Sequence, residues 1–158
     1  MSWTPYETGW GNGWIGWSKA GTIDRIVLPG QATPVETAPE PPQIVRRLAG
    51  ELTAYFSGRG ELPPGDEFID AASATAFDEA VYRAVAAIPV GEIMSYSEVA
   101  SHIGRPGAAR AVGAAMAKNR FAPMIPCHRV VGSDGSLRGY AGGLAMKRRL
   151  LEMEAAGA

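Results

Sequence analysis

Residues 95–118 have the sequence SYSEVASHIGRPGAARAVGAAMAK, which predicts two short helices joined by a tight turn. Ser95 can cap the first helix, and Glu98 three residues later completes a capping-box pattern. The glycines and proline of residues 104–107 predict the turn, and a second helix is expected from about Ala108 to the end of the stretch. This is the outline of a helix-turn-helix, although an ordinary helical hairpin has the same pattern.

The second helix of this pair is almost free of bulky side chains. Arg110 is the early exception among Ala108, Ala109, Ala111 and Gly113. Small residues often mark close packing against another element. They also suit a helix that enters the minor groove of DNA, because that groove is only about 6 Å wide and must be widened to admit any helix. Such a helix lacks the long polar side chains that distinguish bases, so we expect little sequence preference if it binds DNA.

The remaining sequence predicts an α+β fold with two domains. Residues 1–72 would form a small strand-rich domain, because glycines alternate with aromatic residues in the first thirty positions. Within it, residues 31–42 are proline-rich and predict a loop, residues 44–56 have helical spacing, and residues 57–72 are expected to be irregular. Residues 73–158 would form a mostly helical second domain that contains the helix-turn-helix.

Composition limits the possible classes of protein. A hydrophobic content of 46% with 20% charged residues is typical of a globular chain, and no apolar run reaches the roughly 18 residues of a membrane helix. The start of the chain has no basic leader followed by an apolar segment, so no signal peptide is expected. One cysteine allows no internal disulfide and favours a cytoplasmic protein. With two histidines besides, a Cys/His zinc site could not be built without carboxylates, and we predict neither metal nor cofactor.

Charge is unevenly distributed along the chain. Residues 1–91 carry 6 basic and 11 acidic side chains, whereas residues 92–158 carry 9 basic and 5 acidic ones. The basic part could face DNA phosphates while the acidic part is turned away. An uneven solvated surface explains the same numbers equally well.

The sequence IPCHRVV at residues 125–131 contains the strongest candidate for chemistry. A lone cysteine beside a histidine is commonly a buried structural thiol. A nucleophilic thiolate, however, needs a nearby base, and an imidazole oriented by a carboxylate supplies one. Glu154, near the end of a C-terminal helix, could fold back to orient His128 beside Cys127.

The PCHRV core at residues 126–130 resembles the active-site motif of the O6-alkylguanine-DNA alkyltransferases, also called methylated-DNA–protein-cysteine methyltransferases. The strong resemblance covers residues 73–158, and residues 1–60 are similar only in outline. Further segments follow in the family's order and spacing: Gly91-Glu92, Ser95-Tyr96, residues 108–113, Lys118-Asn119, residues 139–143, and Lys147, Leu150, Leu151 and Glu154.

The resemblance implies a catalytic group of five residues. Cys127 would accept the alkyl group, His128 would take the thiol proton through a bound water, and Glu154 would fix the histidine tautomer. Asn119 would be the hinge between the small-residue helix and the cysteine segment. Tyr96 would sit by the phosphate of the displaced nucleotide and help to rotate it outward.

The resemblance also implies how DNA and the base are held. Arg110 would fill the space left by the flipped nucleotide, while Ala108, Ala109, Ala111 and Gly113 would let the helix approach the groove. The base pocket would be lined by four residues: Met116, Val130, Tyr140 and Ala141. The partner would be double-stranded DNA containing O6-alkylguanine. Two further questions are left open by the sequence: whether O4-alkylthymine is also a substrate, and whether several copies of a monomeric protein bind along DNA.

Some positions depart from the family or have an open role. Asp78 and Tyr82 stand where relatives often have glutamine and tryptophan, and we interpret both as packing or surface variation. The ligands of the structural zinc found in some members are missing. Arg25 and Arg138 are candidates for DNA contacts, whereas Arg129 is expected to form a structural ion pair.

Three other classes of protein remain as alternatives. A non-enzymatic alkyltransferase-like protein would bind the lesion without transfer, but such proteins lack the cysteine. A helix-turn-helix regulator with an incidental cysteine does not account for PCHRV. A cysteine hydrolase using Cys127, His128 and Glu154 would turn over, and adjacent Cys and His are unusual for that geometry.

Overall fold

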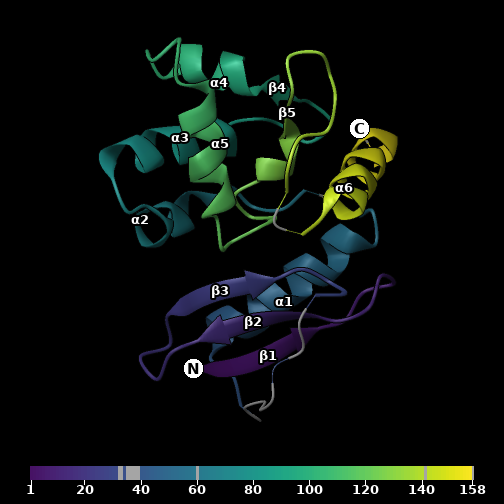
Figure 1. Ribbon diagram of the computed structural model, residues 1–158. Helices are drawn as coiled ribbons and strands as arrows, with labels where there is room; N and C mark the ends of the chain where they lie inside the picture. The colour runs from purple at the N-terminus through teal and green to yellow at the C-terminus, as the bar shows by residue number, and fades with distance from the viewer. Residues whose placement is uncertain (32–33, 35–39, 60, 141, 158) are drawn as a thin grey trace. The chain divides into compact units, whose positions relative to one another are not determined.

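The protein has a mixed α+β fold, as the sequence predicted. We describe it from a computed structural model that covers the chain except residues 32–33, 35–39, 60, 141 and 158. The chain forms two compact units, Met1–Leu62 with Arg120–Ala122, and Pro63–Asn119 with Pro123–Ala158. Figure 1 shows the elements of both units.

The first unit is built on a three-stranded antiparallel sheet. Its strands β1 (Ser2–Tyr6), β2 (Gly13–Trp17) and β3 (Ile23–Val27) are paired in the order β1-β2-β3. The predicted antiparallel strands are therefore confirmed. Tyr6 and Gly13 are directly paired, and the Tyr6 ring lies where a side chain at residue 13 would be, so only glycine fits there.

Helix α1 (Gln43–Phe56) packs against β1 and β2 and completes the core of the first unit (Figure 1). Its buried residues recur at helical spacing: Val45, Leu48, Leu52, Tyr55 and Phe56. The helix expected over residues 44–56 is confirmed, but its first buried position is Val45, and Ile44 is exposed. The Tyr6 and Phe56 rings stack with centroids 6.0 Å apart. The predicted proline-rich loop lies mostly in residues outside the described part of the chain.

A short segment from later in the chain also belongs to the first unit. The backbone N–H of Ile26 donates to the Arg120 carbonyl at 2.9 Å, and Arg120 Nε donates to the Asp24 carbonyl at 2.8 Å. Residues 120–122 are thus attached to β3, immediately after Asn119 in the sequence.

The second unit is mostly helical. Its helices are η1 (Gly65–Phe68), α2 (Ile69–Ala72), α3 (Ala76–Ala86), α4 (Tyr96–His102), α5 (Ala109–Ala117), η2 (Cys127–Arg129) and α6 (Leu144–Gly157). The expectation that residues 57–72 are irregular was wrong for residues 65–72. Phe68, Ile69 and Ala72 are buried there, and α2 packs on α3. The compact units accordingly divide at residues 62 and 63, whereas a domain boundary at residues 72 and 73 stays a prediction.

The predicted helix-turn-helix is present as α4, a turn and α5. The Ser95 side chain accepts from the Glu98 N–H at 3.0 Å, and the Glu98 carboxylate accepts from the Ser95 N–H at 3.1 Å, so the capping box is confirmed. Helix α5 spans Ala109–Ala117, one residue shorter at each end than expected. Helices α4 and α5 contact each other and α3 (Figure 1).

Two very short strands place the cysteine segment beside α4. Strands β4 (Met94–Ser95) and β5 (Val130–Val131) pair in parallel, with Met94 opposite Val130 and Ser95 opposite Val131. The sequence did not predict this pair, because two residues are too few for an alternating pattern. Since Ser95 also caps α4, the pairing fixes the start of that helix next to the Cys127 segment. In the described residues, no helix is long and apolar enough to span a membrane.

Candidate active site

Cys127 lies at the start of η2, between Pro126 and the strand β5. Its side chain is buried. The side-chain amide of Asn119 donates to the Cys127 sulfur at 3.2 Å and to the Ile125 carbonyl at 2.8 Å. Asn119 therefore holds both the sulfur and the backbone that precedes it, which agrees with its expected place between α5 and the cysteine segment.

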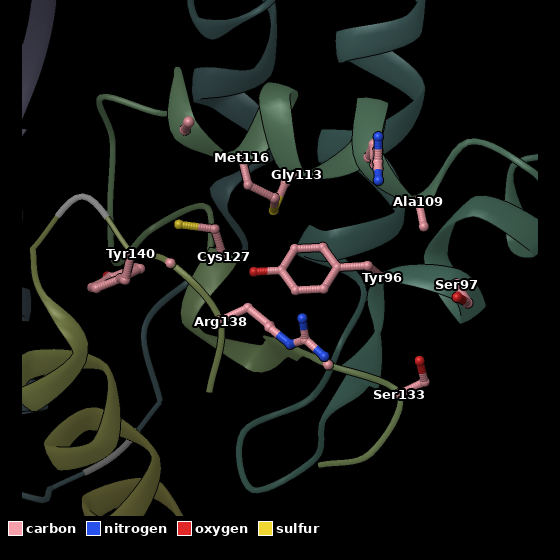
Figure 2. A pocket seen from close by; sticks show the side chains of 13 residues that line it. Tyr96, Ser97, Ala109, Gly113, Met116, Cys127, Ser133, Arg138 and Tyr140 are labelled. Carbon is pink, nitrogen blue, oxygen red and sulfur yellow. The ribbon is translucent and has the colours of Figure 1, made fainter. Parts of the chain in front are cut away.

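The thiol faces a cavity of about 620 Å³ in the second unit. Figure 2 shows Tyr96 crossing this cavity, with Cys127, Met116 and Tyr140 around it. The lining comes from α4, α5, the cysteine segment and the loop that follows β5: Tyr96, Ser97, Ala109, Arg110, Gly113, Met116, Ala117, Cys127, Gly132, Ser133, Arg138, Gly139 and Tyr140. A volume of this order lies in the range of pockets that bind small organic molecules, and it is large enough to admit a base.

His128, Arg129 and Glu154 form a buried cluster beneath the cysteine. His128 Nε2 lies 2.8 Å from Glu154 Oε2, and Arg129 binds both oxygens of Glu154 through Nε and Nη2 at 2.8 Å each. Arg129 also donates to the Ile88 carbonyl at 2.7 Å. The ion pair expected for Arg129 is therefore confirmed, and it balances the charge of Glu154, which is costly to bury alone.

This cluster fixes the state of the histidine. Because the Glu154 carboxylate is held as an anion by Arg129, His128 Nε2 carries a proton and donates it to Glu154. Nδ1 then has a free lone pair, and among the described residues it is buried without a hydrogen-bond partner. Burial lowers the pKa of His128, although the bond to Glu154 opposes this, so the ring is neutral at neutral pH and can accept a proton.

The pKa of Cys127 is set by opposing effects. Burial raises it, while the hydrogen bond from Asn119 and the charge of Lys147 lower it in part. The thiol is therefore protonated at rest and needs a base, which the neutral His128 beside it can supply.

Lys147 is a buried cation that the sequence analysis assigned no role. Its Nζ donates to the Arg138 carbonyl at 2.8 Å and lies 3.4 Å from the Tyr96 hydroxyl. No carboxylate of the described residues is within ion-pair distance of it, and burial lowers the pKa of Lys147 while Cys127 opposes this. The spacing of Lys147, Leu150 and Glu154 on one face of α6 could have revealed its burial.

The small-residue helix α5 contributes one wall of the cavity. Ala109, Arg110 and Gly113 line it, and the Arg110 side chain is exposed. Ala111 is exposed outside the cavity, and Ala108 is the residue that precedes the helix. Four of the five positions thus lie on the cavity side or the exposed surface of α5, and the fifth, Ala108, lies at its start.

Not every predicted pocket residue lies in the cavity. Met116 and Tyr140 line it. Val130 is fully buried in β5 and is not among the lining residues, and Ala141 lies outside the described part of the chain. Tyr140 places its hydroxyl in a buried position.

The structure also adds residues to the site. Lining positions that the sequence did not single out are Ser97, Ala117, Gly132, Ser133 and Gly139. All except Ala117 lie in the first turn of α4 or in the loop after β5, and of these only Gly139 belongs to a segment that the family resemblance had indicated, residues 139–143. Asp78 and Tyr82 are both buried, so of the two interpretations, packing and surface variation, packing is the one that the structure confirms. Among the described residues, no three His, Cys, Asp or Glu side chains are grouped as a metal site would require.

A helix-turn-helix beside a cavity that opens onto a buried thiol, with a carboxylate-oriented histidine next to it, defines a protein with a candidate cysteine nucleophile at a candidate DNA-binding surface. Comparison with known families identifies it further. Residues 76–156 match the model described as 6-O-methylguanine DNA methyltransferase, DNA binding domain, and the chain belongs to this family.

Individual relatives agree with this assignment. The methylated-DNA–protein-cysteine methyltransferase of Mycobacterium tuberculosis is 50% identical over 104 residues, which cover 66% of this chain and 61% of that protein. The Salmonella typhimurium protein of the same name is 46% identical over 107 residues, 68% of this chain and 61% of its own length. The crystal structure of Mycobacterium tuberculosis OGT in complex with DNA has a TM-score of 0.78 and 32% identity, and covers 100% of this chain and 95% of that chain. The matched sequence thus spans less than two thirds of these curated relatives.

Proposed function

We propose that the protein repairs alkylated DNA by moving the alkyl group from O6 of guanine onto the sulfur of Cys127. The observation that carries this proposal is the position of the thiol on a cavity large enough to admit a base, beside a neutral histidine and next to a helix-turn-helix. Relatives named methylated-DNA–protein-cysteine methyltransferase support it.

The transfer follows from the side chains around the sulfur. His128 Nδ1 accepts the thiol proton through a bound water, and the positive charge that develops on the ring is stabilised by Glu154. The thiolate then attacks the alkyl carbon, forming the carbon–sulfur bond as the carbon–oxygen bond breaks. The guanine leaves as its oxygen anion and takes up a proton, for which the Tyr140 hydroxyl is the proposed donor.

The product explains why the reaction would stop after one event. A thioether is stable, and the sequence has no second thiol that could take the alkyl group away. One molecule would therefore repair one base, without a metal or cofactor.

DNA would be bound through α5, with the damaged base turned out of the duplex into the cavity. The alkyl carbon is out of reach while the base is stacked, and flipping costs a few kcal/mol. Arg110 would fill the vacated space, and Tyr96 would help to rotate the nucleotide. Ala108, Ala109, Ala111 and Gly113 would let the helix approach the minor groove with little sequence preference.

The working form would be a monomer acting on double-stranded DNA in the cytoplasm. A free thiol as the reactive group suits a reducing compartment. We propose Met116 and Tyr140 as residues that contact the flipped base. Val130 would act behind them by holding the cysteine segment against β4, and the role of Ala141 stays an expectation from the family.

The proposal is tested with a duplex carrying one radiolabelled O6-methylguanine. The label should move to the protein, reach at most one per chain, and map to Cys127. Repeated turnover would instead indicate the hydrolase alternative. Tight binding without transfer would indicate a non-enzymatic alkyltransferase-like protein, which the presence of Cys127 argues against.

A further inference from the structure

Asn119 follows a helix end that is closed by two backbone hydrogen bonds: the Lys118 N–H donates to the Ala115 carbonyl at 3.2 Å, and the Asn119 N–H donates to the Met116 carbonyl at 3.1 Å. Helix α5 ends at Ala117 without a left-handed glycine, since every residue with positive φ among the described ones is a glycine elsewhere in the chain. The last turn of a helix leaves backbone carbonyls unsatisfied and frays easily. Asn119 follows two residues later, yet its amide must stay within hydrogen-bonding distance of the Cys127 sulfur.

Helix α3 holds the C-terminal end of α5 through two side chains that lie one helical turn apart. The Tyr82 hydroxyl donates to the Ala115 carbonyl in the last turn of α5 at 2.6 Å. The Asp78 carboxylate accepts from Lys118 Nζ at 3.0 and 2.8 Å. Helix α3 contacts α5 (Figure 1), so both bonds hold the same end of α5.

In both contacts the side chain that α3 contributes is buried in the second unit. Tyr82 is fully buried and the Asp78 side chain is 3% exposed, whereas the Lys118 side chain is 52% exposed. Burial alone would raise the pKa of Asp78, but the bonds from Lys118 and the Ala74 N–H hold it below its ordinary value. Asp78 is therefore a fixed anion to which Lys118 is drawn from the surface.

We propose that Tyr82 and Asp78 are positioning residues, which hold the last turn of α5 and thereby keep the Asn119 amide on the Cys127 sulfur. The two contacts are proposed to affect the reactivity of the Cys127 thiol, which can be measured without DNA. Only their importance for DNA repair rests on the proposed function. Loss of the Asn119 hydrogen bond removes an effect that lowers the pKa of Cys127. A weakened support should therefore appear as a thiol that needs higher pH to react.

The experiment measures the rate of Cys127 alkylation by iodoacetamide as a function of pH. Tyr82→Phe and Lys118→Met each remove one contact, and Asn119→Ala is the reference for complete loss. We expect all three to move the midpoint of the pH profile upward, with the rate at pH 7.4 falling about threefold or more, since one pKa unit changes the thiolate fraction about tenfold. The other groups that act on this thiol remain in every variant: Lys147 of α6, Tyr96 of α4, and His128 and Tyr140.

Matched controls separate positioning from stability. Tyr6→Phe removes a buried tyrosine hydroxyl that donates to the Val27 carbonyl in the first unit, and Arg83→Met removes an exposed ion pair with Glu79 on α3 itself. Both controls should leave the midpoint unchanged, whatever they do to the melting temperature. Lys118→Arg keeps the pair with Asp78 and should restore the normal profile.

A double variant tests whether the effect passes through Asn119. Tyr82→Phe should cause no further shift in an Asn119→Ala background, because the bond that it supports is already gone. The proposal is overturned if Tyr82→Phe and Lys118→Met leave the midpoint unchanged, if Tyr6→Phe shifts it equally, or if the shifts add in the double variant. Failure of the labelled-lesion experiment with these shifts present would overturn the proposed function alone.

Discussion

The two compact units use their buried polar groups differently. In the first unit, the buried Tyr6 hydroxyl donates a hydrogen bond to a backbone carbonyl, and the core consists of aromatic and aliphatic side chains. In the second unit, five acidic or basic side chains are buried: Asp78, His128, Arg129, Lys147 and Glu154. Burying a charge costs free energy unless partners offset it.

This difference indicates which unit carries the chemistry. An apolar core would stabilise the second unit as well as the ion pairs do. The charged groups instead act on Cys127, as Lys147 does, hold the neighbouring His128, as Glu154 with Arg129 does, or hold the helix end that leads to the thiol, as Asp78 does. We therefore expect changes in the second unit to alter the reaction, and comparable changes in the first unit to alter stability alone.

The largest effect is expected for Cys127→Ser. A hydroxyl is a far weaker nucleophile than a thiolate toward a saturated carbon, so label transfer from the duplex should fall below detection. Serine is similar in size, and the variant should keep its circular dichroism spectrum and bind the duplex. Residual transfer to another residue would show that the cavity does not define the acceptor.

Glu154→Gln should have the next largest effect. The neutral amide no longer stabilises a charged His128 and leaves Arg129 without its counter-ion, so the rate of transfer should fall on the order of 100-fold. Because one partner of a buried ion pair is lost, the free energy of unfolding should drop by about 3–5 kcal/mol. Single-turnover kinetics and denaturant unfolding measure the two effects.

Glu152→Gln provides the control on the same helix. Glu152 is exposed on α6, two residues before the buried Glu154. The substitution should change the free energy of unfolding by no more than about 0.5 kcal/mol. Equal effects of the two variants would contradict the assignment of Glu154 to the site.

The rate of transfer as a function of pH should show the ionisation of the Cys127 thiol. Burial raises the pKa of Cys127, so below it the rate of transfer should increase about tenfold per pH unit if proton loss limits the reaction. The folded protein then keeps this proton to higher pH than the unfolded chain, whose thiol has a pKa of about 8.5. The retained proton stabilises the folded state. This stabilisation is fully present below the pKa of the thiol in the unfolded chain, and it is lost as pH rises through the pKa of the thiol in the folded protein.

Unfolding measurements check the sign of this effect. Between the two pKa values the free energy of unfolding should fall with pH in the parent protein, and Cys127→Ser should lack this decline. A rate that is independent of pH across the same range would show that another step limits transfer.

Arg110→Ala should separate DNA handling from thiol chemistry. The side chain is exposed on α5 at the edge of the cavity. Losing about 1.4 kcal/mol of support for the flipped state would reduce transfer from a duplex about tenfold. Reaction with free O6-benzylguanine should be unchanged, and Arg105→Ala, in the preceding turn, is the control. Equal losses on both substrates would mean that Arg110 supports the fold.

The sequence predicted those parts of the molecule that depend on local patterns. The capping box at Ser95, the helical spacing of α1 and the cysteine motif each lie within a few consecutive residues. The β4–β5 pair joins residues 94–95 to 130–131, and no local pattern in two-residue strands indicates a partner. The family resemblance, and not periodicity, supplied the role of Asn119, whereas the requirement of a histidine base for a carboxylate already indicated Glu154.

Buried polar residues were the hardest to interpret. Asp78 is an acidic residue on a helix, a kind of residue that is usually exposed, and its burial is stabilised by Lys118, 40 residues later, together with the Ala74 N–H. Lys147 is similar, since its environment is created by the Arg138 carbonyl and the Tyr96 ring, with Nζ 5.6 Å from the ring centroid. Such contacts are long-range, so they follow from the fold and not from the neighbouring sequence.

The smallest effect on the reaction is expected for Tyr6→Phe in the first unit. The variant removes the 2.7 Å bond to the Val27 carbonyl and leaves that acceptor partly unsatisfied, which should cost about 1–3 kcal/mol of unfolding free energy. Transfer from the labelled duplex should stay within about twofold of the parent rate, because no cavity-lining residue belongs to this unit. Tyr82→Phe is the matched change in the second unit, where a similar bond is lost but the thiol should become less reactive. If Tyr6→Phe slowed transfer as much as Tyr82→Phe while both remained folded, buried bonds in either unit would tune the site, and the division between a stabilising unit and a reactive one would be wrong.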